Sequence, residues 1–170
     1  MDVFEAIRTV LAVRRYVSKP VPAATVARIV EAGRLTASAM NKQPWHFIVV
    51  EQRGTLRELG RIVTTGRYLA DAALAIVVLV EKRSPLAVSD GSRAIQDMIL
   101  AAWSEGVGSN WVGFGSMPEV EKLVGAPATM EGLAIVSFGH PAAKLGRGKK
   151  QRRPLAEIAS RERFGVPYSN

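Results

Sequence analysis

The sequence contains no cysteine and only two histidines. The first absence excludes a disulfide framework, a thiolate nucleophile and a metal site built from cysteine ligands. The chain also lacks any apolar run near the roughly 20 residues that cross a bilayer. Its first residues, MDVFEAIRTV, carry an early acid and no long apolar segment of the kind found in a signal peptide. These absences predict a cytoplasmic protein with no membrane partner.

The residues that usually carry enzyme chemistry are also scarce. His46 and His140 stand in unrelated contexts without metal-ligand spacing, and a structural role is favoured for His46 at the start of a strand. There is no GxSxG turn and no Walker loop. The acidic pairs at 119–121 and 157–162 are typical of solvated or ion-paired surface. We therefore predict no catalytic side chain and no metal, so that in an enzyme a bound cofactor would supply the reactivity.

What is present indicates one compact domain over residues 1–170, with 48% apolar and 22% charged residues. The run LAIVVLV at 74–80 is apolar on both faces, which predicts a central strand covered on both sides. Interleaved helices and strands predict a layered α/β arrangement. We expect helices over 2–12, from Pro22, over 55–62, 90–105 and 118–124, and strands over 46–51, 74–80, 109–114 and 133–139. So few strands also suggest that the chain completes its core by pairing with a second copy.

Positive charge is concentrated near the end of the chain. The formal net charge is +8, and KLGRGKKQRRP at 144–154 carries six of the basic residues. Such a run attracts phosphate, and three interpretations remain open: a nucleic-acid contact, a solvated tail, or a binding site for one small phosphorylated ligand.

The stretch ASAMNKQPWHF at 37–47 places hydroxyl and amide groups on a turn of small residues, directly before a strand. We interpret this turn as a holder for the polar edge of a planar cofactor. The alternative is that Ser38 and Asn41 simply close the turn after the second helix.

Three motifs, in this order, resemble those of the nitroreductase family of FMN-dependent oxidoreductases, and the resemblance covers essentially the whole chain. The motifs are Ser38-x-x-Asn41-x-Gln43-Pro44-Trp45-x-Phe47, then Ala94-Ile95-Gln96 with Gly106-x-Gly108-x-x-Trp111-x-Gly113, and last Lys150-x-Arg152-x-Pro154. The resemblance implies an α+β fold with a central mixed sheet flanked by helices, in an intertwined homodimer.

The resemblance also implies FMN as cofactor and a set of residues that bind it. Arg14, Lys150 and Arg152 would bind the phosphate and nearby ribityl oxygens, since arginine and lysine suit a dianion. Ser38, Asn41 and Gln43, from this chain or from a partner, would contact the ribityl chain or the edge of the ring. Trp111, Val112 and Gly113 would form the turn that runs under the ring. In the family a backbone N–H near Gly113 meets flavin N5 and stabilises charge on the reduced ring. The alternative for Trp111 and Trp103 is plain core.

One departure from the family pattern concerns the phosphate. Members usually carry Arg-Arg-Ser where this chain has Val10, Leu11 and Ala12. Either fewer charges hold the flavin, or Arg8, Arg15 or Arg67 substitutes, or the ligand differs.

The resemblance implies hydride transfer from NAD(P)H through flavin N5 to a small nitroaromatic or quinone-type acceptor, in a ping-pong cycle. Two alternatives remain: a same-fold enzyme using other flavin or deazaflavin chemistry, and a small basic nucleic-acid-binding domain. The 6% aromatic content and the lack of a recognisable reading helix argue against the second, so we expect no specific nucleic-acid partner.

Overall fold

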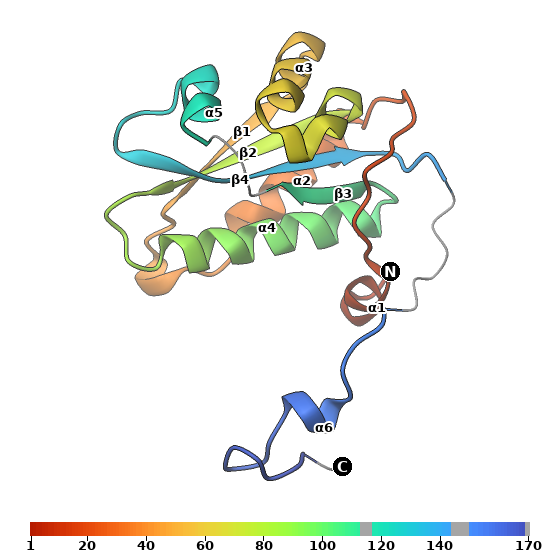
Figure 1. Cartoon of the computed structure of the whole chain (residues 1–170), viewed down its shortest axis with the longest axis vertical. Coiled ribbons are helices and arrows are strands. Elements are labelled where there is room, and N and C mark those ends of the chain that lie inside the picture. Colours follow the sequence, from red (N-terminus) through yellow and green to blue (C-terminus); the bar gives the residue numbers. More distant parts are fainter. Residues whose placement is uncertain (113–116, 144–149, 169–170) are drawn as a thin grey trace.

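The computed structural model describes residues 1–112, 117–143 and 150–168 (Figure 1). In chain order the elements are α1 (Val3–Thr9), α2 (Ala23–Leu35), the 3-10 turn η1 (Ala39–Asn41), β1 (Trp45–Val50), α3 (Arg53–Ile62), the 3-10 segment η2 (Thr64–Asp71), β2 (Leu74–Glu81), α4 (Ala87–Ser104), β3 (Gly108–Val112), α5 (Met117–Val124), β4 (Met130–Gly139) and α6 (Leu155–Ile158).

The sheet has four strands in the order β1-β2-β4-β3, and all three pairings are antiparallel. The α+β class is confirmed, but the expected mixed sheet is not found among these strands. Strand β4 runs between β2 and β3 and opposes both of them, so no parallel pair forms there. Within the described residues the one parallel pairing is an isolated bridge between Ala12 and Ser109.

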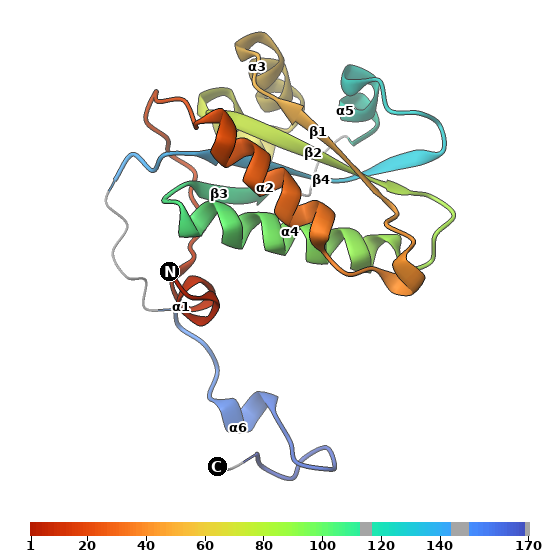
Figure 2. The same cartoon turned by 180° about the vertical axis from the view of Figure 1, so that it is seen from behind.

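Strand β2 is the buried centre of the fold, as its apolar run predicts. Because side chains alternate along a strand, Leu74, Ile76 and Val78 enter one core cluster with α2 and α4. The alternate residues Ala75 and Val77 face the other way and enter a second cluster with α3, η2 and α5. Figures 1 and 2 show these helices on the two faces of the sheet.

The N-terminal segment departs from the predicted helix over 2–12. Helix α1 ends at Thr9, and the chain then runs in extended form beside β3. The N–H of Val13 donates to the Ser109 carbonyl at 2.8 Å. Gly108 permits this approach, because a Cβ there would lie 2.5 Å from Val13 Cγ2. Pairing with β3 therefore competes successfully with continuation of α1.

The C-terminal segment extends away from the layered body (Figures 1 and 2). It carries α6 and leaves the apolar side chains of Leu155, Ile158 and Phe164 exposed. Within the described residues, no helix combines the length and the apolar character that crossing a membrane requires.

Candidate functional site

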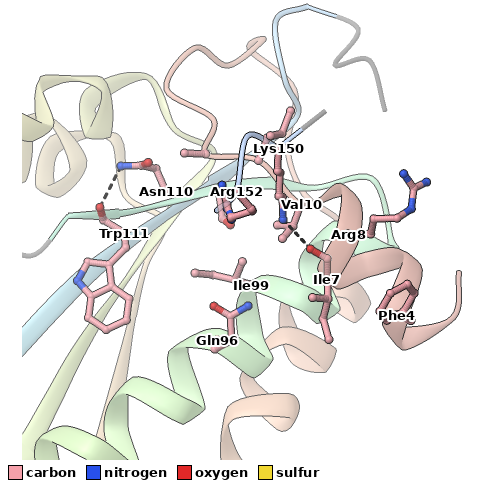
Figure 3. Close-up of a pocket in the computed structure, with 13 residues that line it drawn as sticks. Phe4, Ile7, Arg8, Val10, Gln96, Ile99, Asn110, Trp111, Lys150 and Arg152 are labelled. Carbon is pink, nitrogen blue, oxygen red and sulfur yellow. Dashed lines mark hydrogen bonds between the residues drawn. The ribbon is translucent and has the colours of Figure 1, made fainter. Parts of the chain in front are cut away.

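A large open pocket lies where α1, the extended segment after it, α4, β3 and the C-terminal segment meet (Figure 3). Its volume is about 1000 Å³. The lining residues are Phe4, Ile7, Arg8, Val10, Leu11, Ala12, Gln96, Ile99, Ser109, Asn110, Trp111, Lys150 and Arg152. Among these described residues are three cations and no carboxylate, so the pocket favours an anionic ligand.

Two of the cations come from the C-terminal segment. Lys150 reaches α1, where its Nζ donates to the Ile7 carbonyl at 2.5 Å (Figure 3). Arg152 donates from Nη1 to the Gln151 carbonyl at 2.9 Å. Burial, and next the positive charge of Arg152, lower the pKa of Lys150. Neither side chain takes part in an ion pair found among the described residues, so this part of the pocket is electropositive.

Strand β3 supplies a polar wall that is fixed by hydrogen bonds. Asn110 Nδ2 donates to the Trp111 carbonyl at 3.0 Å and also to the Tyr68 hydroxyl. The Asn110 carbonyl accepts from Ser137 Oγ at 3.4 Å, and the Tyr16 hydroxyl lies 2.7 Å from the same Oγ. Burial raises the pKa of Tyr16, which keeps this phenol neutral. The wall is therefore held by uncharged, mutually bonded groups.

Trp111 extends from this wall with 39% of its surface exposed. Its ring lies on the same side of the pocket as Gln96 of α4 (Figure 3). The alternative that Trp111 is a plain core residue is therefore wrong. Trp103 is half-buried, and its indole N–H donates to Thr9 Oγ1 at 2.9 Å. An exposed indole and a carboxamide in the same pocket offer both a flat apolar surface and hydrogen-bonding groups.

Val10, Leu11 and Ala12 all line the pocket. Their side chains bring only carbon to the positions where the family pattern has two arginines and a serine. Among the described residues, Arg8 is the one cation that the N-terminal part of the chain adds to the lining. Its guanidinium forms a two-point ion pair with Glu5, from Nε to Oε2 at 2.9 Å and from Nη2 to Oε1 at 2.8 Å.

The turn that contains Ser38, Asn41 and Gln43 does not line this pocket in its own chain. Ser38 Oγ accepts from the Gln43 N–H at 2.9 Å, and Gln43 Nε2 donates to the Asn41 carbonyl at 3.2 Å. Ser38 thus closes the turn, as the structural alternative expects, while the side chains of Asn41 and Gln43 remain exposed.

The turn has a strained backbone. Met40, Asn41 and Gln43 have φ values of 52°, 55° and 49°, in the left-handed region that few residues other than glycine occupy. The buried carboxylate of Asp90 on α4 accepts from the Ala39 N–H at 3.1 Å and also pairs with Arg93. Helix α4 therefore holds the turn in a fixed place and presents its amides outward.

The remaining predicted residues lie apart from the pocket lining or outside the described part. Arg14 is exposed, and no ion pair found among the described residues includes it. Val112 is 4% exposed in the second core cluster, so it can offer a ligand only its backbone. Gly113 lies outside the described residues.

Of the predicted set, the structure brings Trp111, Lys150 and Arg152 together at the pocket. Asn110 was missed, although its position beside Trp111 in the glycine-flanked motif is a usable signal. Phe4 and Ile7 were missed as lining residues because the helical spacing of α1 assigns them to core. No group of acidic residues or histidines within the described ranges is arranged to hold a metal.

Comparisons with known proteins agree on one family. The model of the nitroreductase family matches residues 8–92 and 69–140. The predicted NADH dehydrogenase/NAD(P)H nitroreductase of Methanothermobacter thermautotrophicus is 33% identical over 154 residues, covering 86% of this chain and 81% of that protein.

Solved structures share the fold. A predicted NADH dehydrogenase/NAD(P)H nitroreductase from Bacteroides thetaiotaomicron has a TM-score of 0.87 and 26% identity, over 95% of this chain and 98% of that one. A predicted nitroreductase from Desulfovibrio desulfuricans in complex with FMN has a TM-score of 0.82 and 29% identity, over 96% and 98%.

Proposed function

This chain belongs to the nitroreductase family, and we propose that it is an FMN-dependent oxidoreductase that moves hydride from NAD(P)H to a small organic acceptor. The observation that carries the proposal is the cationic pocket beside the β3 wall. The names of its relatives, and the FMN bound in the Desulfovibrio desulfuricans structure, support the same cofactor and reductant.

The residues of the pocket fit the chemical parts of FMN. Lys150 and Arg152 suit a dianionic phosphate, since arginine offers a planar fork of donors and lysine a point charge. Gln96 and Asn110 carry amides suited to ribityl hydroxyls or ring edges, and Trp111, Ile99 and the 10–12 segment offer apolar surface. The volume of about 1000 Å³ falls at the upper end of ordinary ligand pockets.

Bound FMN would supply the two-electron chemistry, taking hydride from NAD(P)H and returning it to a nitroaromatic or quinone-type acceptor in a ping-pong cycle. The chain itself would bind and orient the cofactor and exclude water from one side of it. The proposal requires no side chain to act as nucleophile or acid.

We also infer that two copies complete each site. The Ser38–Gln43 turn presents exposed amides yet does not line its own chain's pocket. The C-terminal segment leaves apolar side chains uncovered as it extends from the body. In the homodimer that we infer, the second copy covers this segment, and the turn of each copy serves the pocket of the other.

The direct test is the absorbance spectrum of the purified protein. We expect a yellow protein whose released chromophore has the mass of FMN and whose flavin bands bleach on addition of NADH or NADPH. A colourless protein that takes up no added FMN refutes the proposed function.

A further inference from the structure

The 3-10 segment η2 supports strand β3 from the second core cluster, on the face of the sheet opposite α4. A Cβ added to Gly66 of η2 would lie 2.8 Å from Val112 Cγ1, so η2 and β3 approach closely there. Two residues earlier along β3, Asn110 Nδ2 donates to the hydroxyl of Tyr68. Because side chains alternate along a strand, Asn110 and Val112 face the same way, and η2 contacts both of them.

The orientation of the Asn110 amide is fixed by its two hydrogen-bond partners. Nδ2 donates to the Trp111 carbonyl at 3.0 Å (Figure 3) and also to the Tyr68 hydroxyl. A carbonyl oxygen can only accept, so the amide atom beside the Trp111 carbonyl must be the nitrogen and not the oxygen. The NH₂ group has two hydrogens, and both are therefore used within the chain.

The amide oxygen is the part of the Asn110 side chain that remains for a ligand. No hydrogen bond to Oδ1 is found among the described residues, and in the same part of the chain no buried side-chain nitrogen or oxygen lacks a partner. Oδ1 is therefore accessible, although only 6% of Asn110 is exposed. Since Asn110 lines the pocket, the wall offers a hydrogen-bond acceptor at this point, where a freely turning amide would offer a donor or an acceptor.

We propose that Tyr68 is a positioning residue, which holds the Asn110 amide so that its oxygen accepts a hydrogen bond from an N–H or O–H of the bound flavin. Tyr68 is half-buried and is not among the lining residues, so it acts on a ligand through Asn110. Without its hydroxyl, the second N–H of the amide would also be open to a ligand, and the wall would no longer select a donor. This inference rests on the proposed function, because it concerns the same site.

The first measurement needs no flavin. The side-chain NH₂ of Asn110 gives two correlated signals in a ¹H–¹⁵N NMR spectrum of the full-length protein, identified by their loss in Asn110→Ala. In Tyr68→Phe one of the two hydrogens loses its acceptor, so its signal should shift upfield and exchange faster with water. The matched control is Tyr16→Phe, because the Tyr16 hydroxyl bonds to Ser137 and to the Val13 carbonyl instead of the amide, and this variant should leave both signals unchanged.

The second measurement is the Kd for FMN, from the quenching of flavin fluorescence when apoprotein is titrated, in the wild type, the two single variants and the double variant. Loss of one neutral hydrogen bond is expected to weaken FMN binding about twofold to tenfold in Asn110→Ala. Tyr68→Phe should weaken it by no more than that. In the double variant the Tyr68→Phe change should add nothing, because the residue through which it acts is gone.

The negative outcomes are distinguishable. Unchanged Asn110 signals in Tyr68→Phe overturn the positioning role, and so does an equal loss of FMN affinity from Tyr68→Phe with and without Asn110, because Tyr68 then acts independently. Wild-type FMN affinity in Asn110→Ala overturns the contact with the flavin. Each of these results leaves the proposed function standing. A wild-type protein that binds no flavin overturns the proposed function and the flavin contact, and the NMR signals then still decide whether Tyr68 holds the amide.

Discussion

The close approach of the N-terminal segment to β3 predicts a strong effect of Gly108→Ala. The added Cβ would lie 2.5 Å from Val13 Cγ2, 2.9 Å from Val13 Cβ and 3.1 Å from Pro141 Cγ. Carbon atoms pack at about 3.5–4.0 Å, so Val13 or β3 must move by roughly 1 Å. Val13 is 4% exposed and cannot swing into solvent without leaving the core.

Overpacking of this kind costs about 1–3 kcal/mol of unfolding free energy. For a domain of this length, each kcal/mol lowers Tm by about 2–4 °C, so we expect a fall of about 2–12 °C. The displaced 10–12 segment also lines the pocket, so FMN affinity should fall together with stability. Thermal and urea unfolding measure the first effect, and flavin titration measures the second.

The matched control is Gly54→Ala on α3, where an added Cβ meets nothing within 4 Å. Because alanine favours a helix over glycine, this variant should be as stable as the wild type or more stable by up to about 1 kcal/mol. Our account of the N-terminal segment is refuted if Gly108→Ala matches Gly54→Ala in both Tm and FMN affinity.

Two further predictions concern charge and assembly. Burial and the charge of Arg152 lower the pKa of Lys150, so its ammonium loses its proton at a lower pH than a free lysine. FMN affinity should therefore fall as the pH rises toward that range in the wild type, but not in Lys150→Arg, because arginine stays charged. Identical pH profiles for the two proteins would contradict a contact between Lys150 and the phosphate. Asn41→Gly keeps the left-handed backbone but removes the side-chain amide, and this variant and Arg152→Gln should each weaken FMN binding. If two copies share each site, refolding equal amounts of the two variants together should restore wild-type affinity at about one quarter of the sites, because half of the dimers are mixed and each mixed dimer has one intact site. No recovery would show that the two copies do not share the sites.

The sequence predicts the layered fold well where local pattern and tertiary burial agree. The LAIVVLV run is apolar on both faces, and β2 is buried on both faces as expected. The stripe that includes Ile95 and Met98 likewise specifies a helix, and α4 packs it against the sheet. The boundaries of these elements differ from the expected ones by a few residues.

The sequence does not predict the N-terminal wall. Ile7, Val10 and Leu11 have helical spacing, but Val10 and Leu11 fall in an apolar segment that suits an extended conformation equally well. The choice is made by backbone pairing with Ser109, about a hundred residues later. Trp111, Lys150 and Arg152 are found from motif resemblance, whereas the place of Val10, Leu11 and Ala12 on the pocket wall depends on that long-range pairing.

The strained turn also could not be predicted from the local sequence. Met40 and Gln43 are not residue types that favour positive φ, and Asp90, which anchors the turn, lies about fifty residues later on α4. The roles of Asn41 and Gln43 toward a flavin, and the copy from which they come, stay predictions.

Helix α4 has a consequence for communication between sites. Asp90 near its start anchors the Ser38–Gln43 turn, and Gln96 and Ile99, about 9–14 Å further along at 1.5 Å per residue, face the pocket. A packed helix of this length behaves as one rigid element. In the proposed dimer, one helix would therefore carry both a wall of one pocket and the anchor of the turn that serves the neighbouring pocket, so the two sites would share a single rigid element.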